Sequence, residues 1–177
     1  MSRPDFRTAI HEAGHAVLVW HHGESSSLIV WPDAETRATC RYQGAFSPGA
    51  DVEISMAGLA AEDVFFGDVG GWARKPGEQP TEAELDANFE IESGARTDIE
   101  SVVRRGNFTY RVRGKKMRLS LQDRFTYAIG AFAFARRIVE KNRGAVEAIA
   151  KAFMLADLDE TAVASLAAAK APTGGAS

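Results

Sequence analysis

Apolar residues recur every three to four positions along most of this chain, which is the period of an α-helix. This pattern predicts helices over residues 4–22, 50–66, 81–105, 120–142, 144–156 and 159–170. Three shorter stretches carry β-branched and aromatic residues instead, which predicts strands at 27–31 and 38–43 and a hairpin within 107–118. The order of these elements predicts an α+β fold that is mostly α-helical, with a small β-sheet.

The length and hydrophobic content of the chain indicate one domain. Of its 177 residues, 45% are hydrophobic, which is enough for a single core. We therefore expect one domain over residues 1–170 and a disordered tail at 171–177, whose sequence is APTGGAS. The longest apolar stretch, near 128–135, is much shorter than the roughly 20 residues of a membrane-spanning helix. The N-terminus also lacks the apolar segment of a signal peptide.

Charge and cysteine content exclude several classes of protein. The net charge of −3 does not fit a basic nucleic-acid-binding protein, so we expect no nucleic-acid partner. Cys40 is the single cysteine, so the chain can form neither an intrachain disulfide nor a structural zinc finger. This predicts a reducing compartment, which for a chain without a targeting segment is the cytoplasm. The sequence contains no GxxxxGK[ST] loop for ATP.

The first predicted helix carries the HExxH sequence HEAGH at residues 11–15. Histidines four residues apart lie on the same face of a helix, so His11 and His15 can bind one zinc ion. Glu12 lies about 100° around the helix from His11, where a general base could act on water beside the metal. Apolar residues occupy the opposite side of this helix: Phe6, Ala9, Ala13, Ala16, Val17 and Trp20. The alternative is a chance spacing on an exposed or structural face.

A catalytic zinc site needs a third protein ligand. The two other histidines, His21 and His22, follow His15 too distantly and are expected to be solvated near the helix end. Asp98 lies at the edge of the apolar stripe of the helix predicted over 81–105. A carboxylate facing a core must be paired or bind a metal. Asp98 is therefore a candidate ligand, and a salt bridge with Arg104 or Arg136 is the alternative.

Two further carboxylates, Glu62 and Asp63, occur in a helix that is apolar nearly all round. A helix of this kind is mostly buried. One of the carboxylates could orient a ligand histidine by accepting a hydrogen bond from the ring nitrogen that does not bind the metal. Both could equally lie near an exposed helix end, and the pattern does not choose between these readings.

Three segments in order resemble the protease domain of the FtsH family of ATP-dependent zinc proteases. HEAGHAVLVW at 11–20 resembles its zinc helix, MAGLAAEDVFFG at 56–67 its AGRAAEE-type helix, and SGARTDIES at 93–101 its TGASNDL-type segment. The stretch 138–166 is similar to the closing helices of the family. The resemblance implies a zincin-like FtsH-type peptidase domain, with Asp98 as the third zinc ligand and Glu62 as a residue that supports the site.

The sequence departs from that family in three places. The ATPase module and membrane anchor of the family have no counterpart here, so a separate ATPase or adaptor is a candidate partner. Residues 70–86 look like an insertion, and 107–118 replaces the usual sequence after the aspartate segment. In the family, a substrate strand adds to a sheet edge beside the zinc, and the candidates here are 27–31 and 38–43.

These features predict a zinc-dependent endopeptidase that hydrolyses unfolded or flexible polypeptides, with His11, His15 and Asp98 holding Zn²⁺ and Glu12 as general base. Two other functions fit the same pattern. One is a metal-containing binding or regulatory module without turnover, and the other is a hydrolase of small peptides or amides. The intact Glu12 favours an enzyme.

Overall fold

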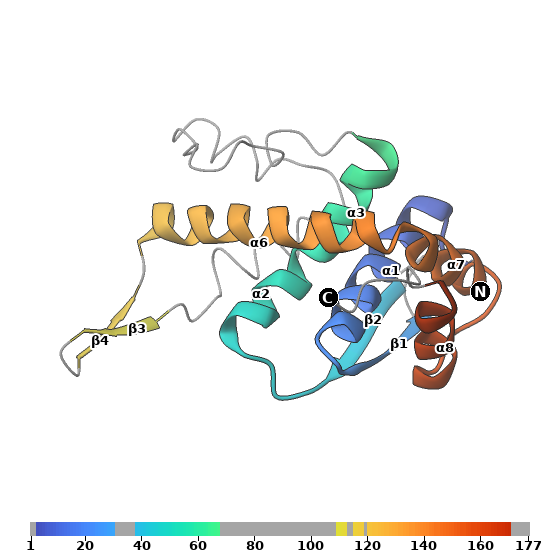
Figure 1. Ribbon diagram of the computed structural model, residues 1–177, viewed down its shortest axis with the longest axis horizontal. Coiled ribbons are helices and arrows are strands. Elements are labelled where there is room, and N and C mark those ends of the chain that lie inside the picture. Colours follow the sequence, from blue (N-terminus) through green and yellow to red (C-terminus); the bar gives the residue numbers. More distant parts are fainter. Residues whose placement is uncertain (1–2, 31–37, 68–108, 113–114, 119, 171–177) are drawn as a thin grey trace, which may run out of the picture.

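A computed structural model describes residues 3–30, 38–67, 109–112, 115–118 and 120–170. Its central element is α1 (Phe6–His21), which contacts most of the other elements. Figure 1 shows α1 between a small sheet on one side and the helices α3 (Ala57–Phe66) and α6 (Leu121–Lys141) on the other. The described residues therefore form a mostly helical α+β fold, as the sequence predicts.

The side chain of Asp5 sets the start of α1. Its carboxylate accepts a hydrogen bond from the Thr8 N–H at 2.7 Å, so the helix begins at Phe6 and not at Pro4 as expected. All residues from Ala9 to Val19 are buried except Glu12, which is half-buried. The predicted apolar side of α1 is confirmed, and neighbouring elements cover the histidine side as well, so the alternative of an exposed histidine face does not apply.

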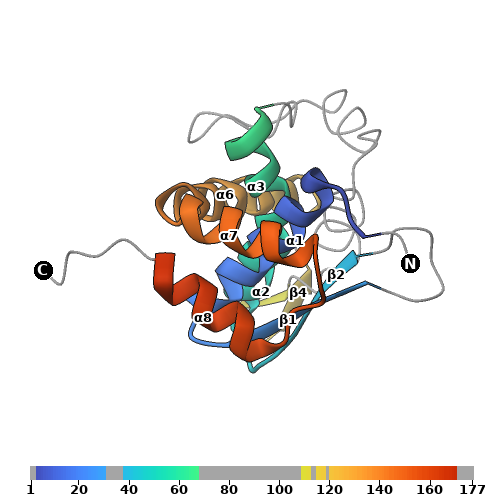
Figure 2. The same cartoon turned by 90° about the vertical axis from the view of Figure 1, so that its right-hand side faces the viewer.

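The sheet beside α1 consists of two antiparallel strands, β1 (Ser25–Val30) and β2 (Ala38–Gln43), close to the predicted positions. Leu28 lies opposite Cys40 in this pair. On its other side, Leu28 exchanges two backbone hydrogen bonds of 2.9 Å with Leu158, which precedes α8 (Glu160–Lys170). Figure 2 shows α8 beside β1. The edge of β1 that faces away from β2 is therefore paired at its centre.

The helix predicted over 50–66 is two helices, α2 (Pro48–Ser55) and α3, which meet at Met56. In one continuous helix, the Ile54 carbonyl would accept the N–H four residues later. Here it accepts a hydrogen bond from the Nδ1 atom of His15 at 2.7 Å. The hydrophobic pattern could not show this break, because both helices bury apolar residues on either side of it.

The C-terminal half of the described chain follows the prediction closely. The segment 107–118 contains an antiparallel hairpin of β3 (Thr109–Val112) and β4 (Lys115–Arg118). After α6 come α7 (Arg143–Phe153) and α8, within three residues of the expected ends. The predicted helix at 81–105, the insertion at 70–86 and the tail at 171–177 lie outside the described residues. No helix in the described part of the chain has the length and hydropathy to span a membrane.

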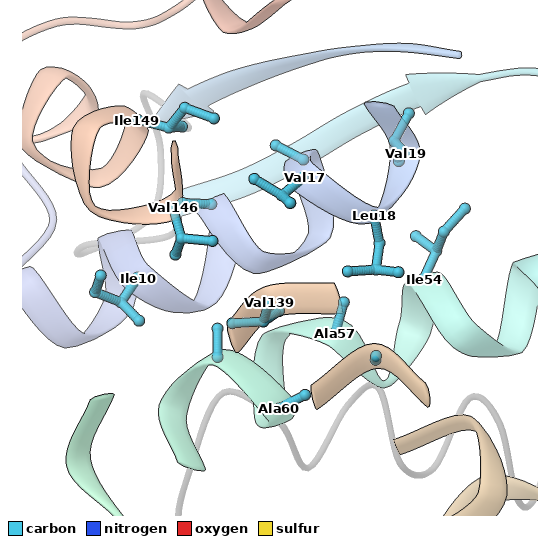
Figure 3. Close-up of a cluster of buried hydrophobic side chains, with 14 of the residues drawn as sticks. Ile10, Val17, Leu18, Val19, Ile54, Ala57, Ala60, Val139, Val146 and Ile149 are labelled. Atoms are coloured by element: carbon cyan, nitrogen blue, oxygen red, sulfur yellow. The ribbon is translucent and has the colours of Figure 1, made fainter. Parts of the chain in front are cut away.

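The core joins α1 to α2, α3, α6 and α7. Figure 3 shows this cluster, with labelled side chains Ile10, Val17, Leu18, Val19, Ile54, Ala57, Ala60, Val139, Val146 and Ile149. The contact between α1 and α3 is close because Gly14 has no side chain. A Cβ atom at Gly14 would lie 2.5 Å from the Ala57 carbonyl oxygen and 2.7 Å from the Ala61 Cβ. This close packing places the histidines of α1 directly against α3.

Candidate metal centre

The two histidines of the HExxH sequence converge at the contact between α1 and α3. Their Nε2 atoms are 3.1 Å apart, and their exposed fractions are 5% for His11 and 7% for His15. Two imidazoles that bind the same zinc tetrahedrally at about 2.0–2.1 Å have their nitrogens about 3.3 Å apart. The observed separation therefore fits two ligands of one ion.

The partner of each Nδ1 atom defines the tautomer of its ring. His15 Nδ1 lies 2.7 Å from the Ile54 carbonyl oxygen, which can only accept, so Nδ1 carries the proton and donates it. His11 Nδ1 lies 2.8 Å from Oε1 of Glu62. An ionised carboxylate can also only accept. Neutral rings bound in this way have their lone pairs on Nε2.

Glu62 is ionised because its surroundings favour the charged form. Burial raises the pKa of this carboxyl, but the hydrogen bonds from His11 and Arg7, with the charges of Arg7 and of His11 in its protonated form, outweigh burial and lower its pKa below the ordinary value. Only 2% of Glu62 is exposed, so without those partners the charge would be strongly unfavourable. The hydrogen bond between Glu62 and Nδ1 of His11 therefore fits the expected role of Glu62 as a residue that supports a ligand histidine. The alternative, a position near an exposed helix end, does not apply to Glu62.

A shared proton or a metal cation stabilises two facing imidazole nitrogens 3.1 Å apart. A Cβ atom at Gly58 of α3 would lie 2.4 Å from the Nε2 atom of His11 and 2.6 Å from that of His15. A side chain at position 58 would therefore collide with both rings. The two imidazole nitrogens at this separation are a donor pair that fits a zinc ion.

Glu12 lies on α1 next to His11 and faces β2. Its Oε2 atom accepts the backbone N–H of Cys40 at 2.5 Å. The centre of β1 makes its outward hydrogen bonds to Leu158, so at this register the N–H of Cys40 points away from β1. Glu12 therefore links α1, the helix of the histidine pair, to the outward side of β2.

The other residues that the sequence offered for the site are Asp98, Asp63, His21 and His22. Asp98 lies outside the described residues, and the described ones contain no cluster of three or more His, Cys, Asp and Glu side chains that could hold a metal. Asp63 pairs with Arg136 at 2.5 Å and turns away from His11. His22 lies 3.1 Å from a carboxylate oxygen of Glu53. The pKa of exposed His21 is lowered by partial burial and by the charges of His22 and Lys141.

Three contributors to the centre did not emerge from the sequence. The Ile54 carbonyl becomes available through the break between α2 and α3, which the apolar pattern does not reveal. Gly58 is visible in the sequence only as a helix residue of low propensity. Arg7 binds Glu62, and its one signal is its position one helical turn before His11.

Comparison with known proteins adds no relative. A scan against protein-family models finds no match, and a search of curated proteins finds no significantly similar sequence. The function therefore has to be argued from the histidine pair, its partners and the adjacent strand.

Proposed function

We propose that this protein is a zinc-dependent endopeptidase with an FtsH-like peptidase fold. The observation that carries the proposal is the buried pair of imidazoles whose Nε2 atoms converge 3.1 Å apart on the helix that also carries Glu12. His11 and His15 would supply two ligands. Asp98 is proposed as the third, on the resemblance of its segment to the family alone. A zinc site with three protein ligands keeps a position for water or substrate.

Zinc bound there would polarise the scissile carbonyl and make a water molecule acidic enough to lose a proton near neutral pH. Glu12 would accept that proton as the water oxygen forms its bond to the carbonyl carbon. As the C–N bond breaks, Glu12 would return the proton to the leaving amine nitrogen. The N–H of Cys40 holds the carboxylate toward β2, which keeps the base beside the strand where a peptide would lie.

Contact with Glu12 favours β2 over β1 as the substrate-binding strand. A peptide that adds to a sheet must pair with outward backbone groups. The outward groups of Leu28 in β1 already pair with Leu158. The outward N–H of Cys40 in β2 instead contacts Glu12, the proposed base, and a peptide bound there would take the place of that carboxylate. A polypeptide aligned along β2 would therefore pass next to the base.

Metal content and turnover test this proposal together. We expect the purified chain to bind about one zinc ion and to digest an unfolded test protein. Glu12→Gln retains the size and shape of the side chain but not its basicity, so zinc should stay bound while turnover falls by about two or more orders of magnitude. Glu53→Gln is the matched control, because Glu53, on α2, is a half-buried carboxylate that pairs with His22 at the end of α1.

The ligand assignment is tested by chelator competition. His11→Ala, His15→Ala and Asp98→Ala should each lose zinc, with Asp98→Ala the mildest because both histidines remain. An Asp98→Ala protein that keeps full zinc at chelator levels that strip His15→Ala would refute Asp98 as a ligand. Wild-type turnover in Glu12→Gln would refute the mechanism. Zinc binding without any turnover by the wild type would instead support a binding module.

A further inference from the structure

The carboxylate that orients His11 is itself held by an arginine. Oε2 of Glu62 accepts a hydrogen bond from Nε of Arg7 at 2.6 Å, while Oε1 lies 2.8 Å from Nδ1 of His11. Arg7 and His11 are four residues apart on α1, so they lie on the same face of that helix. Glu62 reaches across from α3 and bridges the two. One oxygen of the Glu62 carboxylate thus pairs with His11, and the other accepts the hydrogen bond from Arg7.

Aromatic packing fixes the guanidinium of Arg7 at its outer end. Its central carbon lies 5.1 Å from the centre of the Phe66 ring, a distance typical of cation–π contacts. The Phe66 ring in turn packs edge-to-face against Phe6 at 6.3 Å. The guanidinium is planar and rigid, so a group held in this way presents its N–H in one direction.

The two histidines differ in how they are oriented. His15 is held by the backbone carbonyl of Ile54, which follows from the fold and needs no side chain. His11 depends on Glu62, whose carboxylate could rotate if only one of its oxygens were bound. The second hydrogen bond, from Arg7, removes that rotation. The orientation of the His11 ring therefore depends on the side chains of Glu62 and Arg7, whereas that of the His15 ring depends on the backbone.

We propose that Arg7 is a positioning residue of the metal centre: through Glu62 it fixes the ring of His11 so that Nε2 faces the same point as Nε2 of His15. This inference rests on the proposed zinc site. It assigns to Arg7 an effect on metal affinity and no contact with metal or substrate. Because 42% of the Arg7 side chain is exposed, its removal leaves no core cavity and its effect should be smaller than that of Glu62.

A double-mutant cycle on zinc affinity of the full chain tests this coupling. Glu62→Gln should weaken zinc binding by about 10- to 100-fold, as expected for a direct partner of a ligand histidine. Arg7→Ala should weaken it by a smaller factor, on the order of 3- to 10-fold. In the double variant, removal of Arg7 should add less than about twofold, because Arg7 acts through Glu62. Arg7→Gln, which keeps the aliphatic stem, is the second variant and has the same expectation.

Arg143→Ala is the matched control. Arg143 also stacks on an aromatic ring of α3, 4.7 Å from the centre of Phe65, so its loss removes a similar cation–π contact. The zinc affinity of the Arg143→Ala protein should stay within about twofold of that of the wild type. Wild-type affinity in both Arg7 variants, or effects that multiply in the double variant, would overturn this inference while the zinc site stands. A wild-type chain that binds no zinc would overturn the zinc site, and the inference with it.

Discussion

At the scale of single residues, the direction of a side chain decides the chemistry more than its type does. Glu62 and Asp63 are adjacent carboxylates in the same helix, and successive residues of a helix point about 100° apart. Glu62 therefore reaches His11, and Asp63 reaches Arg136. The sequence could identify both as carboxylates of a buried helix, but the choice between them depends on how α3 is rotated against α1. That rotation follows from tertiary packing at Gly14, which sequence periodicity does not encode.

Gly58 gives a direct test at this scale. A Cβ at this position would occupy the space in front of both Nε2 atoms, at 2.4 and 2.6 Å, and the hydrogen bonds of the two Nδ1 atoms resist movement of the rings. Gly58→Ala should therefore weaken zinc binding at least about tenfold, a loss comparable with that of a support residue. Elemental analysis after dialysis against a chelator measures the loss.

Gly144→Ala is the matched control for Gly58→Ala. Both glycines are the second residue of a helix, α3 and α7 respectively. A Cβ at Gly144 would have its nearest neighbour, the Cβ of Lys170, at 3.9 Å, which is an ordinary contact. Zinc content should therefore be unchanged in this variant. Equal zinc content in Gly58→Ala and Gly144→Ala would show that the metal does not lie where the two Nε2 atoms converge.

At the scale of elements, the hydrophobic pattern predicted most of the described helices and strands, because each buries a regular apolar face. Their ends depend on single groups. Asp5 caps α1, and Met56 separates α2 from α3. The HExxH spacing predicted the convergence of His11 and His15 and the place of Glu12 on the same helix, since all three residues are local to α1. The supports from α2 and α3 and the proximity of β2 to Glu12 are long-range contacts, and they required the structure.

Two glycine substitutions separate the effect of helix packing from that of helix propensity. Gly14→Ala places a Cβ against the Ala57 backbone and Ala61, so it should lower the free energy of unfolding by about 1–3 kcal/mol. Gly130 of α6 has nothing within 4 Å of such a Cβ. Gly130→Ala should therefore raise stability by about 0.5–1 kcal/mol through helix propensity alone. Urea unfolding measures both. A Gly14→Ala protein as stable as Gly130→Ala would contradict the close packing of α1 on α3.

At the scale of the whole molecule, the position of the histidine pair would limit which substrates the proposed peptidase could bind. The histidine pair lies between α1 and α3, and Glu12 faces the outer edge of β2. Strand addition along that edge requires free backbone N–H and C=O groups in the substrate. In a folded protein those groups are already paired, and complete unfolding requires about 5–15 kcal/mol. The sequence contains no P-loop through which ATP could drive that unfolding.

We therefore predict ATP-independent cleavage of unfolded proteins, flexible termini and loops, with compact folded domains resistant. The measurement compares one substrate protein in a stable form and in a destabilised, largely unfolded variant, each with and without ATP. We assume that only the unfolded form of the substrate is cleaved and that the substrate unfolds and refolds faster than it is cleaved. The cleavage rates of the two substrate forms should then differ by the ratio of their unfolded populations, about tenfold for every 1.4 kcal/mol of difference in stability. Glu12→Gln serves as the inactive control in each arm. Equal rates for the stable and unfolded forms would rule out strand addition as the mode of binding, and stimulation of the pure chain by ATP would require a nucleotide site that the sequence does not show.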